Sequence, residues 1–306
     1  MHPESPRSLR YRPPVATQTG SPALPSKGVW AIRATKTRRL WNDAFAIRVL
    51  APTLATRVLT VVGVLGFPIW RRLTPRPLGL PITVGALRRF NVADRQEIEL
   101  VRAVLAHRQY AIVEIPDDGV VVDLGANVGT ATAFFRAHSS RARIIAVEPD
   151  PETCSRLRAN VGSLPDVEVI EAAVTDQDGT VALRRTDSSW SASLNWGDHG
   201  EVEVRAVRLQ TLLSELDIGE VDLLKVDVEG SEYRIVESFH DWSRMRCIVI
   251  EVHGPTEPVE DALRPTHDLR WVETEDERLL VGTRRKNGRS APRQDHLGVT
   301  GPGVGP

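Results

Sequence analysis

Cysteine, aromatic residues and net charge are all scarce in this chain of 306 residues. Its two cysteines, Cys154 and Cys247, form no Cys-x-x-Cys motif, which excludes a disulfide scaffold and a zinc ribbon and predicts a reducing, cytoplasmic location. Lys and Arg total 39 against 40 Asp and Glu, so the formal charge is −1. That balance argues against a protein that coats nucleic acid, and no nucleic-acid partner is expected.

A long uninterrupted apolar run is also missing. The longest uncharged stretch, 58–70, falls short of the roughly 20 residues that a membrane-spanning helix needs. It starts too far from the N-terminus for a signal peptide. Three interpretations of segment 44–72 stay open: a helix packed on the folded domain or on a second subunit, an interfacial membrane helix, and a membrane span. We expect the segment to be peripheral to catalysis, with peripheral membrane contact as an alternative, and the sequence gives no oligomeric state.

Composition divides the chain into four parts. Residues 1–40 are basic and rich in proline, and residues 286–306 are rich in glycine and proline, so both are predicted to be disordered tails. Residues 41–80 form an apolar, arginine-containing helical segment of uncertain role. Residues 81–285 carry the regular pattern of a single folded domain.

Strand-like and helix-like stretches alternate through that domain. β-Branched runs predict strands at 119–125, 142–150, 167–174, 221–230 and 246–254. Apolar residues at three- and four-residue steps predict helices at 93–109, 130–138, 151–161 and 231–239. Stretches 180–185 and 201–209 predict a hairpin or edge strands, and 269–275 with 277–285 predict an antiparallel pair. This order predicts a doubly wound, Rossmann-like α/β domain whose sheet is mostly parallel, with an antiparallel final strand.

The strongest motif is VVVDLGANVG at 120–129, between a predicted strand and a predicted helix. Gly125 and Gly129 would let a cofactor approach the backbone closely. The G-x-G-x-x-G pattern that seats a pyrophosphate is absent, because Asn127 holds the middle position. Asp123 followed by Gly-x-Asn-x-Gly instead suits a ligand with an ammonium and a carboxylate group. A tight turn without any ligand is the alternative.

Glu148 stands at the end of the next predicted strand, in AVEPD. An acid at that place accepts hydrogen bonds from the two ribose hydroxyls of a bound nucleoside. The alternative is a surface carboxylate that caps the helix predicted to begin at Pro151. Because this acid follows the glycine motif at the right separation, the sequence predicts a cofactor that contains adenosine.

A charged cluster, LLKVDVEGSE at 223–232, interrupts an otherwise apolar strand. Lys225, Asp227 and Glu229 occupy alternate positions, so they are predicted on one side of the strand at its carboxyl end. Such charges are costly unless they are paired, hydrated or functional. A Lys–Asp ion pair beside an acid at a helix N-terminus is the alternative.

The following strand adds Glu251 and His253 in IVIEVHG. A histidine near several carboxylates is a candidate acid–base group. The same acids and His253 could hold Mg²⁺, which prefers oxygen ligands, although this option is not favoured.

The motifs DLGANVGT, AVEPDP, EAAVTDQDGT, LLKVDVEGSE and IVIEVHG occur in the order seen in FkbM-type S-adenosylmethionine-dependent methyltransferases. The resemblance covers roughly 120–254. It implies a class I methyltransferase sheet, S-adenosylmethionine as cofactor, and methylation of a hydroxyl on a sugar, polyketide or other secondary metabolite. One departure is Leu209-Gln210, where family members commonly carry Leu-Asp.

The resemblance also implies site residues. Those expected at the cofactor are Asp123, Gly125, Asn127 and Gly129 for the methionine part, Glu148 for the ribose and Ala173 near the adenine. Those expected to face the transferred methyl, as catalytic residues, are Asp227, Glu229 and His253.

Two other functions compete with the methyltransferase. A nicotinamide-dependent oxidoreductase on a Rossmann fold would need G-x-G-x-x-G and a Tyr-x-x-x-Lys pair, but Tyr233 is followed by Glu237 at the lysine position. A non-catalytic, membrane-associated protein with a methyltransferase-like fold would make use of segment 44–72. The cofactor motif and the KVDVEG motif are both intact, which argues against a protein that has lost its catalytic activity. The expected partner is therefore a small-molecule hydroxyl acceptor.

Overall fold

The computed structural model of the chain describes residues 48, 50–185, 200–274 and 278–285. The tails predicted at 1–40 and 286–306 therefore lie outside the described residues.

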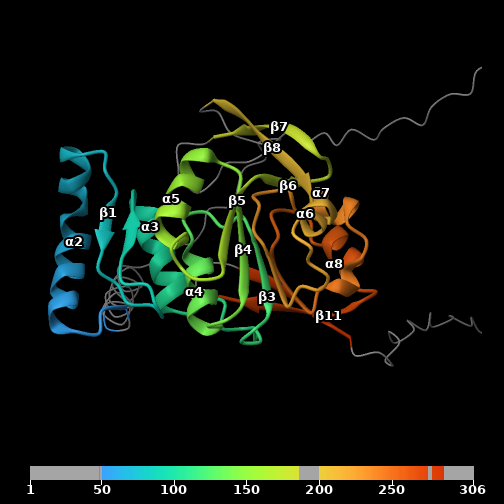
Figure 1. The fold of residues 1–306 in the computed structure, drawn as a ribbon, viewed down its shortest axis with the longest axis horizontal. Coiled ribbons are helices and arrows are strands. Elements are labelled where there is room, and N and C mark those ends of the chain that lie inside the picture. The colour runs from blue at the N-terminus through green and yellow to red at the C-terminus, as the bar shows by residue number, and fades with distance from the viewer. Residues whose placement is uncertain (1–47, 49, 186–199, 275–277, 286–306) are drawn as a thin grey trace, which may run out of the picture. The chain divides into compact units, whose positions relative to one another are not determined.

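A seven-stranded sheet forms the centre of the fold (Figure 1), in the order β11-β12-β10-β9-β3-β4-β5. Its strands are β3 Val120–Leu124, β4 Arg143–Glu148, β5 Val167–Glu171, β9 Leu223–Val226, β10 Cys247–Glu251, β11 His267–Glu273 and β12 Arg278–Arg284. Neighbours from β10 to β5 run parallel, and β12 runs antiparallel to both β10 and β11. The predicted sheet, with its antiparallel final strand, is confirmed.

Helices cover both faces of this sheet. They are α3 Arg95–Leu100, α4 Thr130–His138, α5 Pro151–Val161, α6 Leu209–Glu215, α7 Glu232–Ser238 and α8 Glu257–Leu263, with a π-helix at Val101–Ala106 and a 3₁₀ turn at Trp242–Arg244. Successive strand residues point to opposite faces, so Val121 joins one apolar cluster and Val122 the other. The first cluster contains side chains of the π-helix, α4 and α5, and the second contains those of α6, α7 and α8.

Two predicted elements differ from the structure. The predicted helix 93–109 is α-helical only over α3 and continues as the π-helix. The predicted strand 167–174 divides into β5 and β6 Ala173–Thr175, because the chain leaves the central sheet after Glu171. β6 joins a separate three-stranded sheet, in the order β6-β8-β7, with β7 Gly179–Arg184 and β8 Glu201–Arg208. β7 and β8 pair antiparallel, as predicted for a hairpin.

The N-terminal part of the described chain adds a long helix and a short ladder. Helix α2 Leu54–Leu73 precedes β1 Leu78–Leu80, which pairs with β2 Phe90–Val92. One face of α2 packs inward, since Thr60 and Phe67 are buried and the Thr60 hydroxyl donates to the Pro81 carbonyl at 3.2 Å. Helix α2 is thus attached to the domain, and the ladder between β1 and β2 joins residues on both sides of the boundary predicted at position 80.

Phe67→Ala is expected to lower the free energy of unfolding by about 3–5 kcal/mol, because a buried aromatic ring leaves a cavity when it is truncated. The side chain is 6% exposed and belongs to the first apolar cluster. Leu65→Ala is the matched control, since Leu65 on the same helix is 75% exposed, and its effect should stay within about 0.5 kcal/mol. Chemical denaturation of both variants measures the difference; equal effects would contradict the packing of α2 on the domain.

Candidate active site

A cleft of about 900 Å³, measured to its open mouth, lies at the carboxyl ends of β3, β4 and β9. Ligands of open α/β sheets bind at this edge. The lining residues are Leu100, Gly125, Asn127, Val147, Glu148, Pro149, Thr153, Ala172, Ala173, Val174, Leu183, Asp227, Val228, Glu229, Ser231 and Glu251. Four of the six predicted cofactor residues are among them: Gly125, Asn127, Glu148 and Ala173.

Gly125 begins the turn that follows β3, and its φ of +72° belongs to the left-handed region that favours glycine. Its N–H donates to the Val147 carbonyl at 3.0 Å. A Cβ on this residue would lie 1.7 Å from the backbone oxygen of Asp227. A glycine is therefore required here because the turns after β3 and β9 approach each other closely. Room for a cofactor is a second reason.

Gly129 and Asp123 do not line the cleft, which differs from the expectation for both. A Cβ on Gly129 would meet side-chain atoms of Leu157 and Val161 at 2.9 Å, so this glycine permits α4 and α5 to pack closely. The Asp123 side chain is fully buried beneath the turn and accepts a hydrogen bond from the Thr132 hydroxyl at 2.7 Å.

Lys225 connects Asp123 to the cleft. Its Nζ lies 3.2 Å from Asp123 Oδ1 and 3.3 Å from Asp227 Oδ2, and it donates to the Gly125 carbonyl at 2.8 Å. Burial opposes the charged form of Lys225, but the two carboxylates outweigh it and hold its pKa well above the ordinary value. The ammonium group therefore fixes both turns that form the floor of the cleft, and the Lys–Asp ion pair considered for this motif is present.

Glu148 ends β4 and is 6% exposed. Its two carboxylate oxygens accept backbone N–H groups of Asn127 and Asp150, each at 3.0 Å. Burial raises the pKa of Glu148 to about 7, against the opposing effect of these two donors. Asn127, with φ of +49°, contributes a second polar atom: its side-chain Oδ1 is buried and has no hydrogen-bond partner among the described residues. A ligand with hydroxyl and ammonium donors would satisfy both groups.

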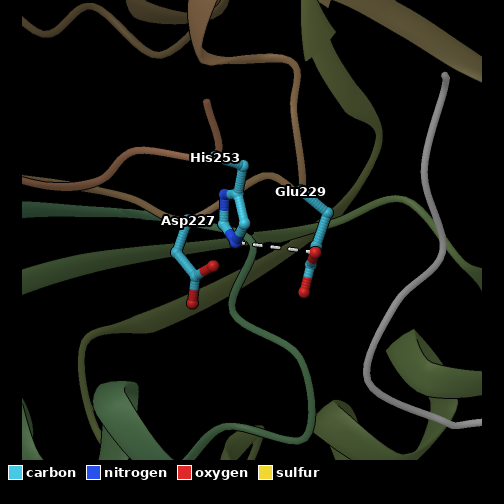
Figure 2. Close-up of side chains that lie close together, drawn as sticks. All are labelled: Asp227, Glu229 and His253. Carbon is cyan, nitrogen blue, oxygen red and sulfur yellow. Dashed lines mark ion pairs between the residues drawn. The ribbon is translucent and has the colours of Figure 1, made fainter. Parts of the chain in front are cut away.

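Asp227, Glu229 and His253 lie close together (Figure 2), with ligand atoms within 4.8 Å of one another, and the first two of them line the cleft. The predicted strands end earlier than expected, at Val226 and Glu251, so these side chains lie in loops after β9 and β10 rather than alternating along strands. The turn after β9 causes this difference. Its residues Glu229 and Gly230 have φ of +50° and +96°, which extended strand geometry excludes.

His253 is surrounded by carboxylates. Its Nδ1 lies 3.0 Å from Glu232 Oε1, while Nε2 lies 3.4 Å from Glu251 Oε1 and 3.6 Å from Glu229 Oε2. Hydrogen bonds to Glu232 and Glu251 raise the pKa of His253 to about 11. The imidazole is therefore a cation at neutral pH, which suits it to orient carboxylates and not to accept a proton.

The pKa of the Glu229 carboxyl is shifted toward neutrality. Burial, and then the neighbouring Asp227, raise its pKa to about 7. Glu229 lines the cleft together with Asp227. A carboxylate with a pKa near the working pH can accept a proton from a bound hydroxyl.

The sequence did not reveal the part played by Glu232. This residue is 1% exposed, and its Oε1 accepts the Gly230 N–H at 3.1 Å besides contacting His253. It therefore holds the turn after β9 and the histidine together. From the sequence, its position in the first turn of a predicted helix indicated only that Glu232 is an acid at a helix N-terminus. Leu100 and Leu183 were also missed as cleft residues, because nothing local in their segments distinguishes a cleft wall from the core.

The sheet order, the glycine turn after its first parallel strand and the buried acid after the second define a class I S-adenosylmethionine-dependent methyltransferase. Residues 123–276, which are 154 of the 306 residues, match the Methyltransferase FkbM domain. The chain belongs to this family. The resemblance inferred from the motifs is thereby confirmed, as is the methyltransferase class with its S-adenosylmethionine cofactor, and the nicotinamide alternative loses its support.

Three curated relatives illustrate the match. The 31-O-demethyl-FK506 methyltransferase FkbM of Streptomyces tacrolimicus is 32% identical over 193 residues, which cover 52% of this chain and 73% of that protein. The 2-O-methyltransferase NoeI of Sinorhizobium fredii is 26% identical over 149 residues, covering 42% and 61%. The AMB antimetabolite synthetase AmbE of Pseudomonas aeruginosa is 28% identical over 225 residues, which are 57% of this chain but 10% of that much longer protein.

Proposed function

We propose that this protein transfers the methyl group of S-adenosylmethionine to a hydroxyl oxygen of a small molecule, such as a sugar, a polyketide or another secondary metabolite. The observation that carries the proposal is one cleft that is lined by Glu148 together with Asp227 and Glu229. The names of two relatives, a 31-O-demethyl-FK506 methyltransferase and a 2-O-methyltransferase, support oxygen as the methylated atom. We also propose a cytoplasmic location, and the two free, buried cysteines support it.

The chain's own residues fit the cofactor. When bound, S-adenosylmethionine supplies an electrophilic methyl group on a sulfonium sulfur. Glu148 would accept the ribose hydroxyls, and the unpartnered Oδ1 of Asn127 would accept an N–H of the methionine ammonium. Ala173, which is 4% exposed, gives the adenine region an apolar wall.

On the acceptor side, the protein has to align the hydroxyl and remove its proton. Glu229 is the proposed base because it lines the cleft and its pKa is about 7. Asp227 is held by Lys225 at 3.3 Å, so we assign it to orienting the acceptor. His253, a cation between carboxylates, orients Glu229.

The proposal requires no metal ion. Asp227, Glu229 and His253 nonetheless offer three ligand atoms within 4.8 Å of one another, so Mg²⁺ bound by this cluster is the alternative. Dialysis against a chelator is expected to leave turnover unchanged. A loss of activity that added Mg²⁺ restores would assign these residues to a cation.

Affinity for S-adenosylmethionine is expected to rise as the pH increases through about 7, the pKa of Glu148 in the free protein. The ionised carboxylate accepts both ribose hydroxyls, whereas the protonated form loses acceptor capacity. Glu148→Gln should bind the cofactor roughly 5- to 150-fold more weakly, the cost of charge-assisted hydrogen bonds, and its affinity should vary little with pH. Calorimetry from pH 5.5 to about 8.5 covers this range. Glu152→Gln, which changes an exposed acid of α5, is the control.

Two measurements test the function itself. Calorimetry should show binding of S-adenosylmethionine and S-adenosylhomocysteine but not of NADPH. Incubation with methyl-labelled S-adenosylmethionine and a panel of sugars and polyketide alcohols should transfer label to oxygen. Binding of NADPH in place of S-adenosylmethionine, or transfer of label to nitrogen or carbon acceptors alone, would contradict the proposal.

A further inference from the structure

Helix α2 carries an outer face that no other part of the described chain covers. Every large hydrophobic side chain that is exposed among the described residues belongs to this helix: Leu54, Val58, Leu59, Val62, Leu65, Ile69, Trp70 and Leu73. Their exposed fractions range from 37% at Trp70 to 79% at Leu73. Exposed apolar side chains scattered singly are ordinary on a soluble protein, but a contiguous patch indicates an interaction surface.

The spacing of these residues places them on one side of the helix. Leu54, Val58, Val62, Leu65 and Ile69 follow one another at steps of three or four residues, which is the repeat of a single helical face. The opposite side is occupied by the protein itself, where a Cβ on Gly63 would already lie 3.1 Å from a Leu80 methyl group. The helix therefore has one face for the domain and one apolar face without a partner.

The charge of the surrounding segment has a single sign. Residues 44–93 contain no Asp or Glu, while they contain seven arginines: Arg48, Arg57, Arg71, Arg72, Arg76, Arg88 and Arg89. Arg71 and Arg72 stand in the last turn of α2, and both are exposed. The chain as a whole is nearly neutral, with a formal charge of −1, so this excess of arginine is a local feature. An apolar face bordered by arginines is complementary to an anionic lipid surface. Each basic residue near such a surface contributes roughly 1 kcal/mol of binding free energy.

We propose that α2 docks this protein on an anionic phospholipid membrane, lying in the interface with its outer apolar face among the acyl chains. Arg71 and Arg72, with the exposed Arg76, reach the phosphates, and Trp70 sits at the headgroup level that its ring favours. This inference goes beyond the proposed methyl transfer and does not depend on it.

The same observations argue against a membrane span. By length and composition alone, α2 is long and apolar enough to cross a bilayer. However, Thr60 and Phe67 are buried against the domain, and a spanning helix would have to leave those contacts. A second copy of the chain is also disfavoured as the occupant, because pairing two α2 helices would bring two acid-free, arginine-rich segments together.

Sedimentation with vesicles tests the proposal on the full chain. Vesicles of phosphatidylcholine with phosphatidylglycerol should bind the protein, and vesicles of phosphatidylcholine alone should bind it at least tenfold more weakly. Raised salt should weaken the binding to the anionic vesicles, since exposed charges are screened. A wash with alkaline carbonate should release the protein from the vesicles. A protein held by a membrane-spanning helix would stay in them.

Two pairs of variants separate the apolar and the electrostatic contributions. The double variant Val62→Glu with Leu65→Glu should abolish vesicle binding, whereas Gln210→Glu with Ser214→Glu, which adds the same charges on exposed positions of α6, should not. Arg71→Gln with Arg72→Gln should weaken binding to anionic vesicles roughly 10- to 30-fold. Its control is Arg141→Gln with Arg264→Gln, two exposed arginines elsewhere.

The outcomes are distinct. Failure of the wild-type chain to bind anionic vesicles at low salt would overturn the inference, as would unchanged binding by Val62→Glu with Leu65→Glu. Retention after the carbonate wash would replace it with a span. A dimer in light scattering that the same double variant dissociates, without vesicle binding, would assign the face to a second copy. Calorimetry with S-adenosylmethionine on each variant shows that the domain is folded and tests the enzymatic proposal separately.

Discussion

Gly125→Ala is expected to lower the free energy of unfolding by more than about 3 kcal/mol and to abolish cofactor binding. The new Cβ would lie 1.7 Å from the backbone oxygen of Asp227 and 2.8 Å from its carbonyl carbon. Backbone atoms cannot rotate away as a flexible side chain can, so either the turn after β3 or the turn after β9 must move. The φ of +72° at Gly125 adds strain for any residue with a Cβ.

The same clash reaches the cofactor site by a second route. Asp227 donates its backbone N–H to the Leu124 carbonyl at 3.1 Å, and Lys225 donates to the Gly125 carbonyl at 2.8 Å. Moving either turn breaks these bonds and leaves a buried ammonium with a lost acceptor, which is costly. We therefore expect lost stability and lost S-adenosylmethionine affinity to occur together.

Gly219→Ala is the matched control for this substitution. A Cβ at position 219 would meet no heavy atom within 4 Å, and its φ lies outside the left-handed region. Its stability should stay within about 0.5 kcal/mol of the wild type. Thermal unfolding and calorimetry on both variants make the comparison. A Gly125→Ala protein that unfolds and binds cofactor like the Gly219→Ala protein would contradict the contact between the two turns.

Local patterns in the sequence were sufficient for much of the fold. The helices predicted at 130–138 and 151–161 are α4 and α5 with the same bounds. α5 starts with Pro151 after Asp150, whose side chain accepts the Thr153 N–H at 2.9 Å. Such capping is encoded by neighbouring residues, so it can be recognised without knowledge of the rest of the chain.

Contacts between distant residues could not be predicted in this way. Gly129 was assigned to the cofactor because a strand–glycine–helix pattern is typical of cofactor turns, yet its Cβ position faces Leu157 and Val161 of another helix. The stretch 167–174 gave no sign that the chain changes sheet after Glu171, because the residues of both β5 and β6 include the β-branched types that are typical of any strand. Helix α2 is a further example. The sequence does not reveal which of its apolar residues are buried against the domain and which are exposed.

The histidine illustrates how charge depends on tertiary contacts. A histidine near carboxylates was expected to be a candidate acid–base group, and the number of acids around it could not be counted from the sequence. Glu232 and Glu251 raise the pKa of His253 to about 11, which removes it as a base at neutral pH. The role of base therefore falls to a carboxylate whose proton affinity is raised instead.

Glu229→Gln is expected to reduce turnover by about 10²- to 10⁴-fold while leaving affinity for S-adenosylmethionine within a few-fold. Glutamine keeps the shape of the side chain but cannot take the proton of the acceptor hydroxyl. In the wild type at saturating S-adenosylmethionine, kcat/KM for the acceptor should rise as the pH increases through about 7, since the base must be ionised and the pKa of Glu229 is about 7. The variant should lose that dependence. Release of S-adenosylhomocysteine with an acceptor from the panel measures both.

Two further variants decide which carboxylate is the base. Glu237→Gln changes an exposed acid of α7 and should turn over like the wild type. Asp227→Asn should slow the reaction less than Glu229→Gln, because the Asp227 carboxylate is already paired with the Lys225 ammonium at 3.3 Å. If Asp227→Asn instead loses 100-fold or more while Glu229→Gln stays near the wild-type rate, Asp227 takes the proton. Lys225 would then have to move away from it when the acceptor binds.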